Sequence, residues 1–278
     1  MATRTLGRSA NLEYLGGLGR LFAGAILFSL PILMTMEMWW LGFYLEPTKL
    51  VQFAVVNFIV LVGLSRVSGF EKTASWGDDA LDALTAYAVA AIWSAVVLWL
   101  FGIVEFGQPA SEIVGKITLQ SVPASFGAML ASKQLGSSQS NDKEKKDRST
   151  YWGQLFLMLA GALFVGFSVA PTEEMILISF RMSAVHSMLL ILISIVLLHG
   201  FVYTVGFKGE EEPAGPATFW GVFVRFSVVG YGIAALVSLY LLWTFGRVEG
   251  TAWPEVAAMV AVLAFPGAIG AALARLVV

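Results

Sequence analysis

Apolar runs of about 20 residues recur along this chain and constrain its fold more than any other feature. Such windows begin near residues 20, 50, 80, 112, 152, 185, 219 and 254. A helix of about 20 apolar residues crosses the hydrocarbon core of a bilayer, where only helices and closed barrels satisfy their backbone polar groups. The chain is 58% hydrophobic and only 13% charged. We therefore predict an all-α bundle of eight transmembrane helices.

Two of these windows are unusual. The first runs from about residue 21 to residue 44 behind a basic N-terminal segment. It is too long for the apolar part of a secretory signal, so we interpret it as an uncleaved first span. The fourth window, residues 110–131, is the least apolar because it contains Glu112, Lys116 and Gln120.

The distribution of basic residues predicts the topology. With the N-terminus inside, thirteen Lys and Arg residues fall on the cytoplasmic side and four fall outside. The positive-inside rule then places both termini in the cytoplasm, and we expect a multi-pass protein of the bacterial cytoplasmic (inner) membrane. Residues 133–150 are polar, of mixed charge and bear Gly and Ser, which predicts a cytoplasmic linker between two halves, 1–132 and 151–278.

The two halves repeat each other in sequence. Thr35, Glu37 and Met38 recur 137 residues later, LWLFGIVE recurs as LWTFGRVE after 144 residues, and the fourth windows align at an offset of 143. Because each half has an even number of windows, we predict two parallel four-helix repeats related by an axis along the membrane normal. Small residues spaced four apart around Gly127 and Gly270 predict close packing of the fourth span of each half.

The repeated carboxylate is the first candidate site. An ionisable group at membrane depth costs about 2.5–3.5 kcal/mol and is therefore a functional-site hypothesis. Pro31 and Pro171 come just before the acids and free backbone carbonyls, which together with carboxylates suit protons or hard cations. The predicted ion- or proton-binding set is Glu37, Glu174, Glu173, Thr35 and Thr172, with Glu37 and Glu174 as the metal ligands. In the alternative interpretation, the glutamates lie at the outer interface and snorkel or cap helices.

Two further sets of charges flank this site. Glu105, Glu249, Glu112 and Glu255 are predicted to make the outer mouth acidic, which would concentrate cations. Taken alone, Glu112 and Glu255 open their spans and suit a helix N-terminus. Asp78, Asp79 and Asp82 lie at the cytoplasmic entry of the third span, and Asp82 aligns in the repeat with Phe226, beside Arg225. An Asp82–Arg225 pair there would be a structural ion pair or an inner gate.

Other classes of protein fit poorly. The chain has no Cys and two His, which leaves no route to thiol catalysis, Fe–S clusters or Cys/His zinc sites. A net charge of −2 suggests no nucleic-acid partner. No phosphate-binding loop or catalytic triad is present, so we expect neither an enzyme nor a cofactor.

The leading hypothesis is membrane transport of cations, either protons or a divalent ion such as calcium, by an exchanger that uses Glu37 and Glu174. One alternative is a cation-selective channel with an acidic outer mouth. An alternative from another class is a non-transporting lipid-binding or assembly protein. The sequence leaves open which ion moves, in which direction, and whether the path lies within one chain or between the subunits of a homo-oligomer.

Over its whole length the chain resembles a bacterial integral-membrane family to which no function is assigned. The features that resemble it are TMEMWW at 35–40, PTEEM at 171–175 and the terminal FPGAIGAALA. The resemblance implies a multi-span inner-membrane protein and nothing about substrate.

Overall fold

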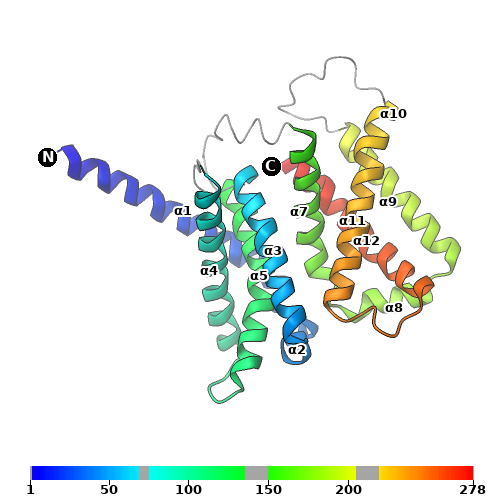
Figure 1. Cartoon of the computed structure of the whole chain (residues 1–278), viewed down its shortest axis with the longest axis horizontal. Coiled ribbons are helices and arrows are strands. Elements are labelled where there is room, and N and C mark those ends of the chain that lie inside the picture. Colours follow the sequence, from blue (N-terminus) through cyan, green and yellow to red (C-terminus); the bar gives the residue numbers. More distant parts are fainter. Residues whose placement is uncertain (1, 69–74, 135–149, 205–218, 278) are drawn as a thin grey trace. The chain divides into compact units, whose positions relative to one another are not determined.

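The computed structural model describes residues 2–68, 75–134, 150–204 and 219–277, and all of its regular elements are helical (Figure 1). The chain forms two compact units. Unit 1 comprises Met1–Phe43 and Val51–Asn141, and unit 2 comprises Tyr44–Leu50 and Asp142–Val278. Most of the predicted linker, residues 135–149, lies outside the described residues.

The helices follow the same order in the two halves of the chain. The first half contains α1 (Ala2–Leu33), α2 (Met36–Tyr44), α3 (Pro47–Ser68), α4 (Trp76–Leu100) and α5 (Ala110–Gln134). The second contains α7 (Tyr151–Val169), α8 (Glu173–Arg181), α9 (Ala184–Thr204), a helix formed by α10 (Phe219–Val222), a π-helical turn η1 (Phe223–Val228) and α11 (Val229–Thr244), and α12 (Trp253–Val277). The short helices α2 and α8 have 9 residues each, and α5 and α12 have 25 each. The helix boundaries therefore follow the sequence repeat.

Within the part of the chain that the structure describes, seven helices are long and apolar enough to cross a membrane. They cover Leu15–Leu33, Pro47–Val67, Trp76–Leu100, Tyr151–Val169, Ala184–Val202, Phe219–Thr244 and Trp253–Ala274. The predicted eighth, α5, has sufficient length but is not among them. Residues 119–129 of α5 are all buried, so this helix faces protein and does not need an apolar surface for lipid. The eight-span arrangement stays a prediction.

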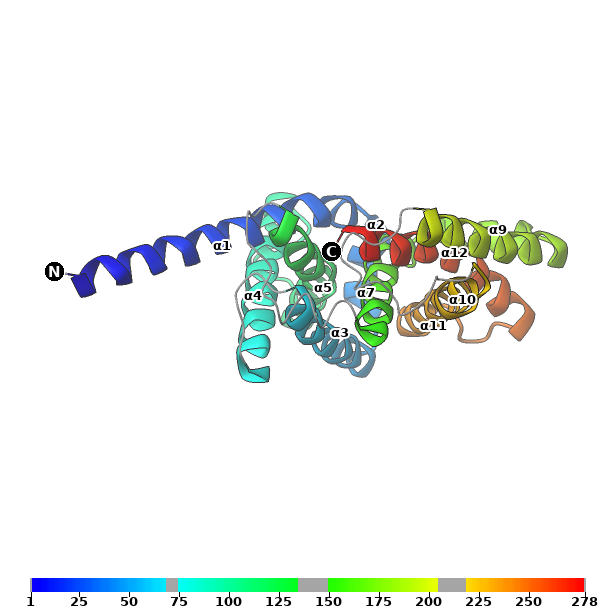
Figure 2. The same cartoon turned by 90° about the horizontal axis from the view of Figure 1, so that it is seen from above.

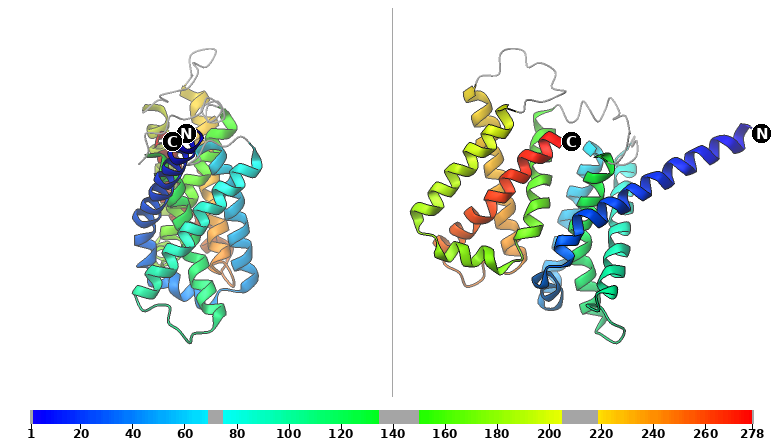
Figure 3. Two further views of the ribbon diagram at one scale, coloured as in Figure 1. Left: turned by 90° about the vertical axis from the view of Figure 1, so that its left-hand side faces the viewer. Right: turned by 180° about the vertical axis from the view of Figure 1, so that it is seen from behind.

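The prediction that the first span continues to residue 44 was wrong. The helix α1 ends at Leu33 and α2 begins at Met36. Pro31 lacks a backbone N–H, which removes one hydrogen bond from the last turn of α1. In unit 2 the same break separates α7 from α8, and α8 runs across the end of the unit (Figure 3).

Glycine contacts hold the long helices of each unit together. A Cβ on Gly161 of α7 would lie 2.2 Å from the carbonyl oxygen of Gly270 on α12. A Cβ on Gly127 of α5 would lie 3.2 Å from the carbonyl oxygen of Gly24 on α1 and 2.5 Å from Cβ of Phe28. The packing predicted for these small residues is confirmed, and Figure 2 shows α1 crossing the side of the α4–α5 pair.

Candidate functional site

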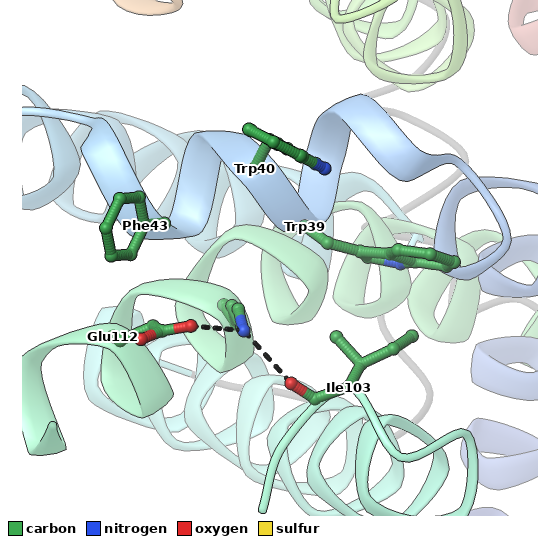
Figure 4. Close-up of a pocket in the computed structure, with 6 residues that line it drawn as sticks. Trp39, Trp40, Phe43, Ile103 and Glu112 are labelled. Atoms are coloured by element: carbon green, nitrogen blue, oxygen red, sulfur yellow. Dashed lines mark hydrogen bonds and ion pairs between the residues drawn. The ribbon is translucent and has the colours of Figure 1, made fainter. Parts of the chain in front are cut away.

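A pocket lies where α2 crosses the beginning of α5 in unit 1. It has a volume of about 370 Å³. Its lining residues are Trp39, Trp40 and Phe43 of α2, Ile103 from the segment between α4 and α5, and Glu112 and Lys116 of α5 (Figure 4). The pocket therefore combines an aromatic wall with one acidic and one basic side chain.

Lys116 is the charged centre of this pocket. It is only 8% exposed, and its Nζ donates hydrogen bonds to Oε1 of Glu112 at 2.5 Å and to the carbonyl oxygen of Ile103 at 3.0 Å. Glu112 and Lys116 are four residues apart, so they lie on one face of α5. A buried ammonium is very costly unless it is paired and hydrogen-bonded. The pair with Glu112 explains how this lysine is accommodated.

Two glycines bring the aromatic wall over the ion pair. A Cβ on Gly115 would come within 2.2 Å of the carbonyl oxygen of Gly42. The helices α2 and α5 therefore meet backbone to backbone, and α2 can lie directly on the first turns of α5. Trp39 is fixed further, because its Nε1 donates to the carbonyl oxygen of Leu33 at 2.7 Å. This carbonyl lies in the last turn of α1, where carbonyl oxygens have no hydrogen-bond partner within their own helix.

Buried polar side chains continue from the pocket along α5. Gln120, Ser121 and Ser125 are each at most 1% exposed. Nε2 of Gln120 donates to the carbonyl oxygen of Ile32 at 3.4 Å, while Oε1 of Gln120 has no hydrogen-bond partner among the described residues. Buried polar atoms are nearly always satisfied by protein or by ordered water. This acceptor therefore indicates a place for water or solute inside unit 1.

A second charged cluster lies at the other end of unit 1, where α4 begins. Asp79 and Asp82 are 0% and 5% exposed. Oδ2 of Asp79 accepts a hydrogen bond from Arg66 at 3.1 Å, and Oδ2 of Asp82 accepts one from the hydroxyl of Ser65. The Arg66 guanidinium also stacks on Trp76 at 4.2 Å, so the cluster joins α3 to α4.

The third predicted aspartate of this group has a local role. Asp78 lies in the first turn of α4 and accepts a hydrogen bond from the Ser75 backbone N–H at 2.9 Å. The Asp78 backbone N–H donates in turn to the Ser75 hydroxyl at 3.2 Å. This reciprocal pair is a capping box. Arg225 lies exposed in η1 of the other unit, and its pairing with Asp82 stays a prediction.

The repeated glutamates occupy the first turns of the two short helices. Glu37 is half-buried at the start of α2, and Glu173 and Glu174 are exposed at the start of α8. Negative side chains are favourable at these positions because of the helix dipole. The described residues contain no group of three or more His, Asp or Glu that could hold a metal ion. Joint action of Glu37 and Glu174, which belong to different units, stays a prediction.

The threonines that precede these acids bond to the backbone. The hydroxyl of Thr35 donates to the carbonyl oxygen of Pro31, and that of Thr172 donates to the carbonyl oxygen of Val169, both at 2.8 Å. These hydroxyls therefore satisfy carbonyls at the ends of α1 and α7.

The other acids predicted at the outer mouth have separate surroundings. Glu105 is exposed. Glu249 forms an ion pair with Lys49. One Oε of Glu255 accepts the Ala252 backbone N–H at 3.3 Å, at the start of α12. Of the four predicted mouth residues, only Glu112 lines the pocket.

Sequence reasoning missed the role of Lys116. The sequence analysis treated this residue as one of the polar residues that make the fourth window the least apolar. The acidic residue four positions earlier was the available signal, because such spacing places an acid and a base side by side on a helix. The aromatic residues of α2 gave no such signal, since Trp near a membrane surface is common in any multi-span protein.

The fold and the site define a multi-pass helical integral membrane protein with a charged, aromatic-walled pocket in one of its two units. The chain belongs to the family described as "Putative integral membrane protein (DUF2391)", whose profile matches residues 17–278. It is also similar to a protein of Nematostella vectensis named "Probable serine incorporator", with 26% identity over 148 residues. That match spans 50% of this chain and 32% of the relative. No solved structure matches the chain significantly.

Proposed function

We propose that this protein transports a small polar solute across the membrane and that the path runs through unit 1. One observation carries the proposal: among the described residues, the buried Asp, Glu, Lys and Arg side chains are Asp79, Asp82 and Lys116, and all three belong to unit 1. Ionisable groups inside membrane proteins are costly and usually mark substrate or ion pathways. A transport role is therefore favoured over a catalytic one.

The buried polar groups are distributed along the unit as a path requires. Lys116 and Glu112 lie at the end of unit 1 that the charge distribution predicts to face outside, and Asp79 and Asp82 lie at the predicted cytoplasmic end. Gln120, on α5 between them, has a buried acceptor with no hydrogen-bond partner among the described residues. Water in this region would connect the two charged ends.

The name of the relative supports a small polar solute. The name refers to serine, and the free amino acid carries one positive and one negative charge at neutral pH. A pocket with one acidic and one basic side chain is chemically suited to such a molecule. The match covers half of this chain, and it supports a class of solute and not serine in particular.

Solute flux in proteoliposomes tests the proposal. Purified protein is reconstituted, radiolabelled amino acids are supplied outside, and uptake is compared between wild type and Gln120→Leu, which removes the buried amide without changing charge. We expect uptake above that of empty liposomes and a decrease of about tenfold in the variant, as expected for about 1.4 kcal/mol. Ser238→Ala in unit 2 is the control, because this buried hydroxyl donates only to the Ala234 carbonyl oxygen of its own helix.

Cation exchange through Glu37 and Glu174 is the second candidate. The observation that favours it is positional: both acids lie in the first turn of the equivalent short helices α2 and α8, and both are accessible to solvent. Dyes sensitive to pH and to Ca²⁺ inside the liposomes would report exchange. Loss of flux in Glu37→Gln with Glu174→Gln, but not in the exposed control Glu46→Gln, is expected. Flux that survives both substitutions would show that these glutamates are not the ion site.

These measurements also separate transport from the remaining class. A lipid-binding or assembly protein would show neither amino acid uptake nor cation exchange in the same liposomes. If wild-type protein that is correctly folded gives no flux of either kind, both transport proposals are wrong. Interfacial glutamates at the starts of α2 and α8 would then have a structural or lipid-contacting role.

A further inference from the structure

We infer that the pocket between α2 and α5 of unit 1 is a binding site for a small zwitterion that carries an ammonium group together with a carboxylate or a phosphate. The inference rests on the proposed function for its biological meaning, since it names the substrate class of the proposed path. Binding itself can be measured without flux, so the two can fail independently.

The ion pair in the pocket leaves hydrogen-bonding capacity on both partners. An ammonium has three N–H donors, and among the described residues Lys116 uses two of them, toward Glu112 and Ile103. The carboxylate of Glu112 accepts through Oε1, which leaves Oε2 for a second donor. A free donor on a cation therefore lies beside a free acceptor on an anion. This arrangement complements a ligand that carries both charges close together.

The net charge of the pocket favours a zwitterion over a simple ion. Glu112 and Lys116 neutralise each other, and their side chains are only 17% and 10% exposed. A bare cation or a bare anion would add an uncompensated charge to this poorly solvated place, which is costly. A zwitterion adds one charge of each sign and can pair with both residues. It therefore preserves electroneutrality.

The aromatic wall favours an ammonium group in particular. Phe43 and Trp39 lie on the side of α2 that faces Glu112 and Ile103 (Figure 4). The face of an indole or phenyl ring attracts cations within about 6 Å, with an energy of about 0.5–2 kcal/mol. The ammonium of a ligand that approaches Glu112 would meet these rings. A volume of about 370 Å³ is at the small end of ligand pockets, which suits an amino acid or a phospholipid headgroup.

Unit 2 lacks the same chemistry at the equivalent positions. Met259 replaces Lys116, and Ile176 and Leu177 replace the two tryptophans, although Glu255 retains the acid. Binding should therefore occur once per chain. The same comparison supplies a matched control, because Glu255 is also an acid in the first turn of its helix but has no lysine four residues later.

Isothermal titration of the protein in lipid nanodiscs tests the inference. Nanodiscs of phosphatidylglycerol contain no ammonium headgroup, so the pocket is not occupied by the surrounding lipid. Serine and glycerophosphoethanolamine, whose phosphodiester carries a single negative charge, are the zwitterionic probes, and choline chloride and sodium acetate are the singly charged ones. We expect saturable binding of a zwitterion with about one site per chain. Choline or acetate bound as tightly as both zwitterions would overturn the inference.

The variants link binding to the pocket. Lys116→Met combined with Glu112→Gln removes both charges together, so neither is left buried alone, and we expect binding at least about tenfold weaker. Phe43→Ala removes a ring that faces Glu112 in Figure 4 and is 65% exposed, so it should weaken binding without affecting the fold. Glu255→Gln should bind as wild type. Wild-type affinity in the double variant, or in Phe43→Ala if the double variant does not fold, would overturn the inference.

Two further arms identify the source of the ligand and separate the inference from the proposed function. If the natural occupant is a lipid headgroup, nanodiscs that contain phosphatidylethanolamine should suppress binding of the soluble probes; if it is a free solute, they should not. Either result supports the zwitterion site. Binding without any uptake in liposomes would retain the site and overturn transport, whereas uptake that is unchanged in the double variant would retain transport and overturn the site.

Discussion

Units 1 and 2 share an order of helices but differ in the chemistry of the last helix of each unit. In unit 1 this helix is α5, and in unit 2 it is α12, offset by 143 residues. Polar residues of α5 are replaced by apolar ones on α12, in the pairs Lys116 and Met259, Gln120 and Leu263, Ser121 and Ala264, and Ser125 and Ala268. The glycine that packs each helix against the first helix of its unit is retained.

The same contrast appears where α4 and the α10–α11 helix begin. Asp79 and Asp82 align with Phe223 and Phe226, which lie in the π-helical turn η1. Unit 2 has its own buried polar contact nearby, between Nδ1 of His199 and the hydroxyl of Ser227 at 2.8 Å. The comparison shows that the two units share their backbone packing, whereas the buried Asp and Lys side chains among the described residues all belong to unit 1. The following predictions test that division.

The largest effect is expected where the shared packing is broken. Gly161→Val places a Cβ at 2.2 Å from a backbone oxygen of Gly270, and a backbone atom cannot rotate away. We expect destabilisation of unit 2 by about 3 kcal/mol or more, measured as a lower thermal midpoint in detergent. Gly232→Ala is the control, since nothing lies within 4 Å of its Cβ, and it should be neutral or slightly stabilising. Equal losses from both would refute the packing argument.

The next effect concerns the buried ion pair of unit 1. Lys116→Met leaves Glu112 without its partner, and breaking a buried pair costs about 3–5 kcal/mol. Because both side chains retain some exposure, we expect a smaller destabilisation of about 2–3 kcal/mol. It should appear as a lower thermal midpoint in the same detergent assay. Adding Glu112→Gln should restore part of the loss, because no unpaired charge remains. Additive losses in the double variant would show that the two residues do not interact.

A smaller effect is expected at the other end of unit 1. Asp79→Asn removes the carboxylate that Arg66 contacts at 3.1 Å, but the guanidinium keeps its place on Trp76 and is partly solvated. We expect a loss of about 1–2 kcal/mol. Hydrogen exchange followed by mass spectrometry should show faster exchange in the last turn of α3 and the first turns of α4. Unchanged protection there would show that the pair does not hold these helices together.

The smallest effect is expected at the helix cap of α4. Ser75→Ala removes the hydroxyl that accepts the Asp78 backbone N–H, and loss of such a cap costs about 1 kcal/mol. Faster hydrogen exchange should be confined to the first turn of α4. Unchanged exchange in the first turn of α4 would show that this hydroxyl does not stabilise the start of the helix.

Much of the architecture was accessible from the pattern of apolar residues and from the repeat. Seven of the eight predicted windows are helices long and apolar enough to span, and Gly127 and Gly270 pack as their spacing predicted. The break after Leu33 was only partly accessible. Pro31 predicted a kink. Whether the chain only bends or begins a new helix depends on the tertiary contacts of the residues that follow, and here α2 packs on the backbone of α5 at Gly115.

The sequence by itself determined that this chain forms membrane-spanning helices in two similar halves, because the length and periodicity of apolar runs are local properties. The sequence also showed that the candidate acids Glu37 and Glu174 occupy equivalent positions in the repeat. Only the tertiary structure decided that α5 is buried among other helices, and therefore that Lys116 pairs with Glu112 beneath an aromatic wall. Hydropathy sums over all faces of a helix, so it cannot distinguish a polar residue that weakens a lipid-facing helix from one that forms a site inside the protein.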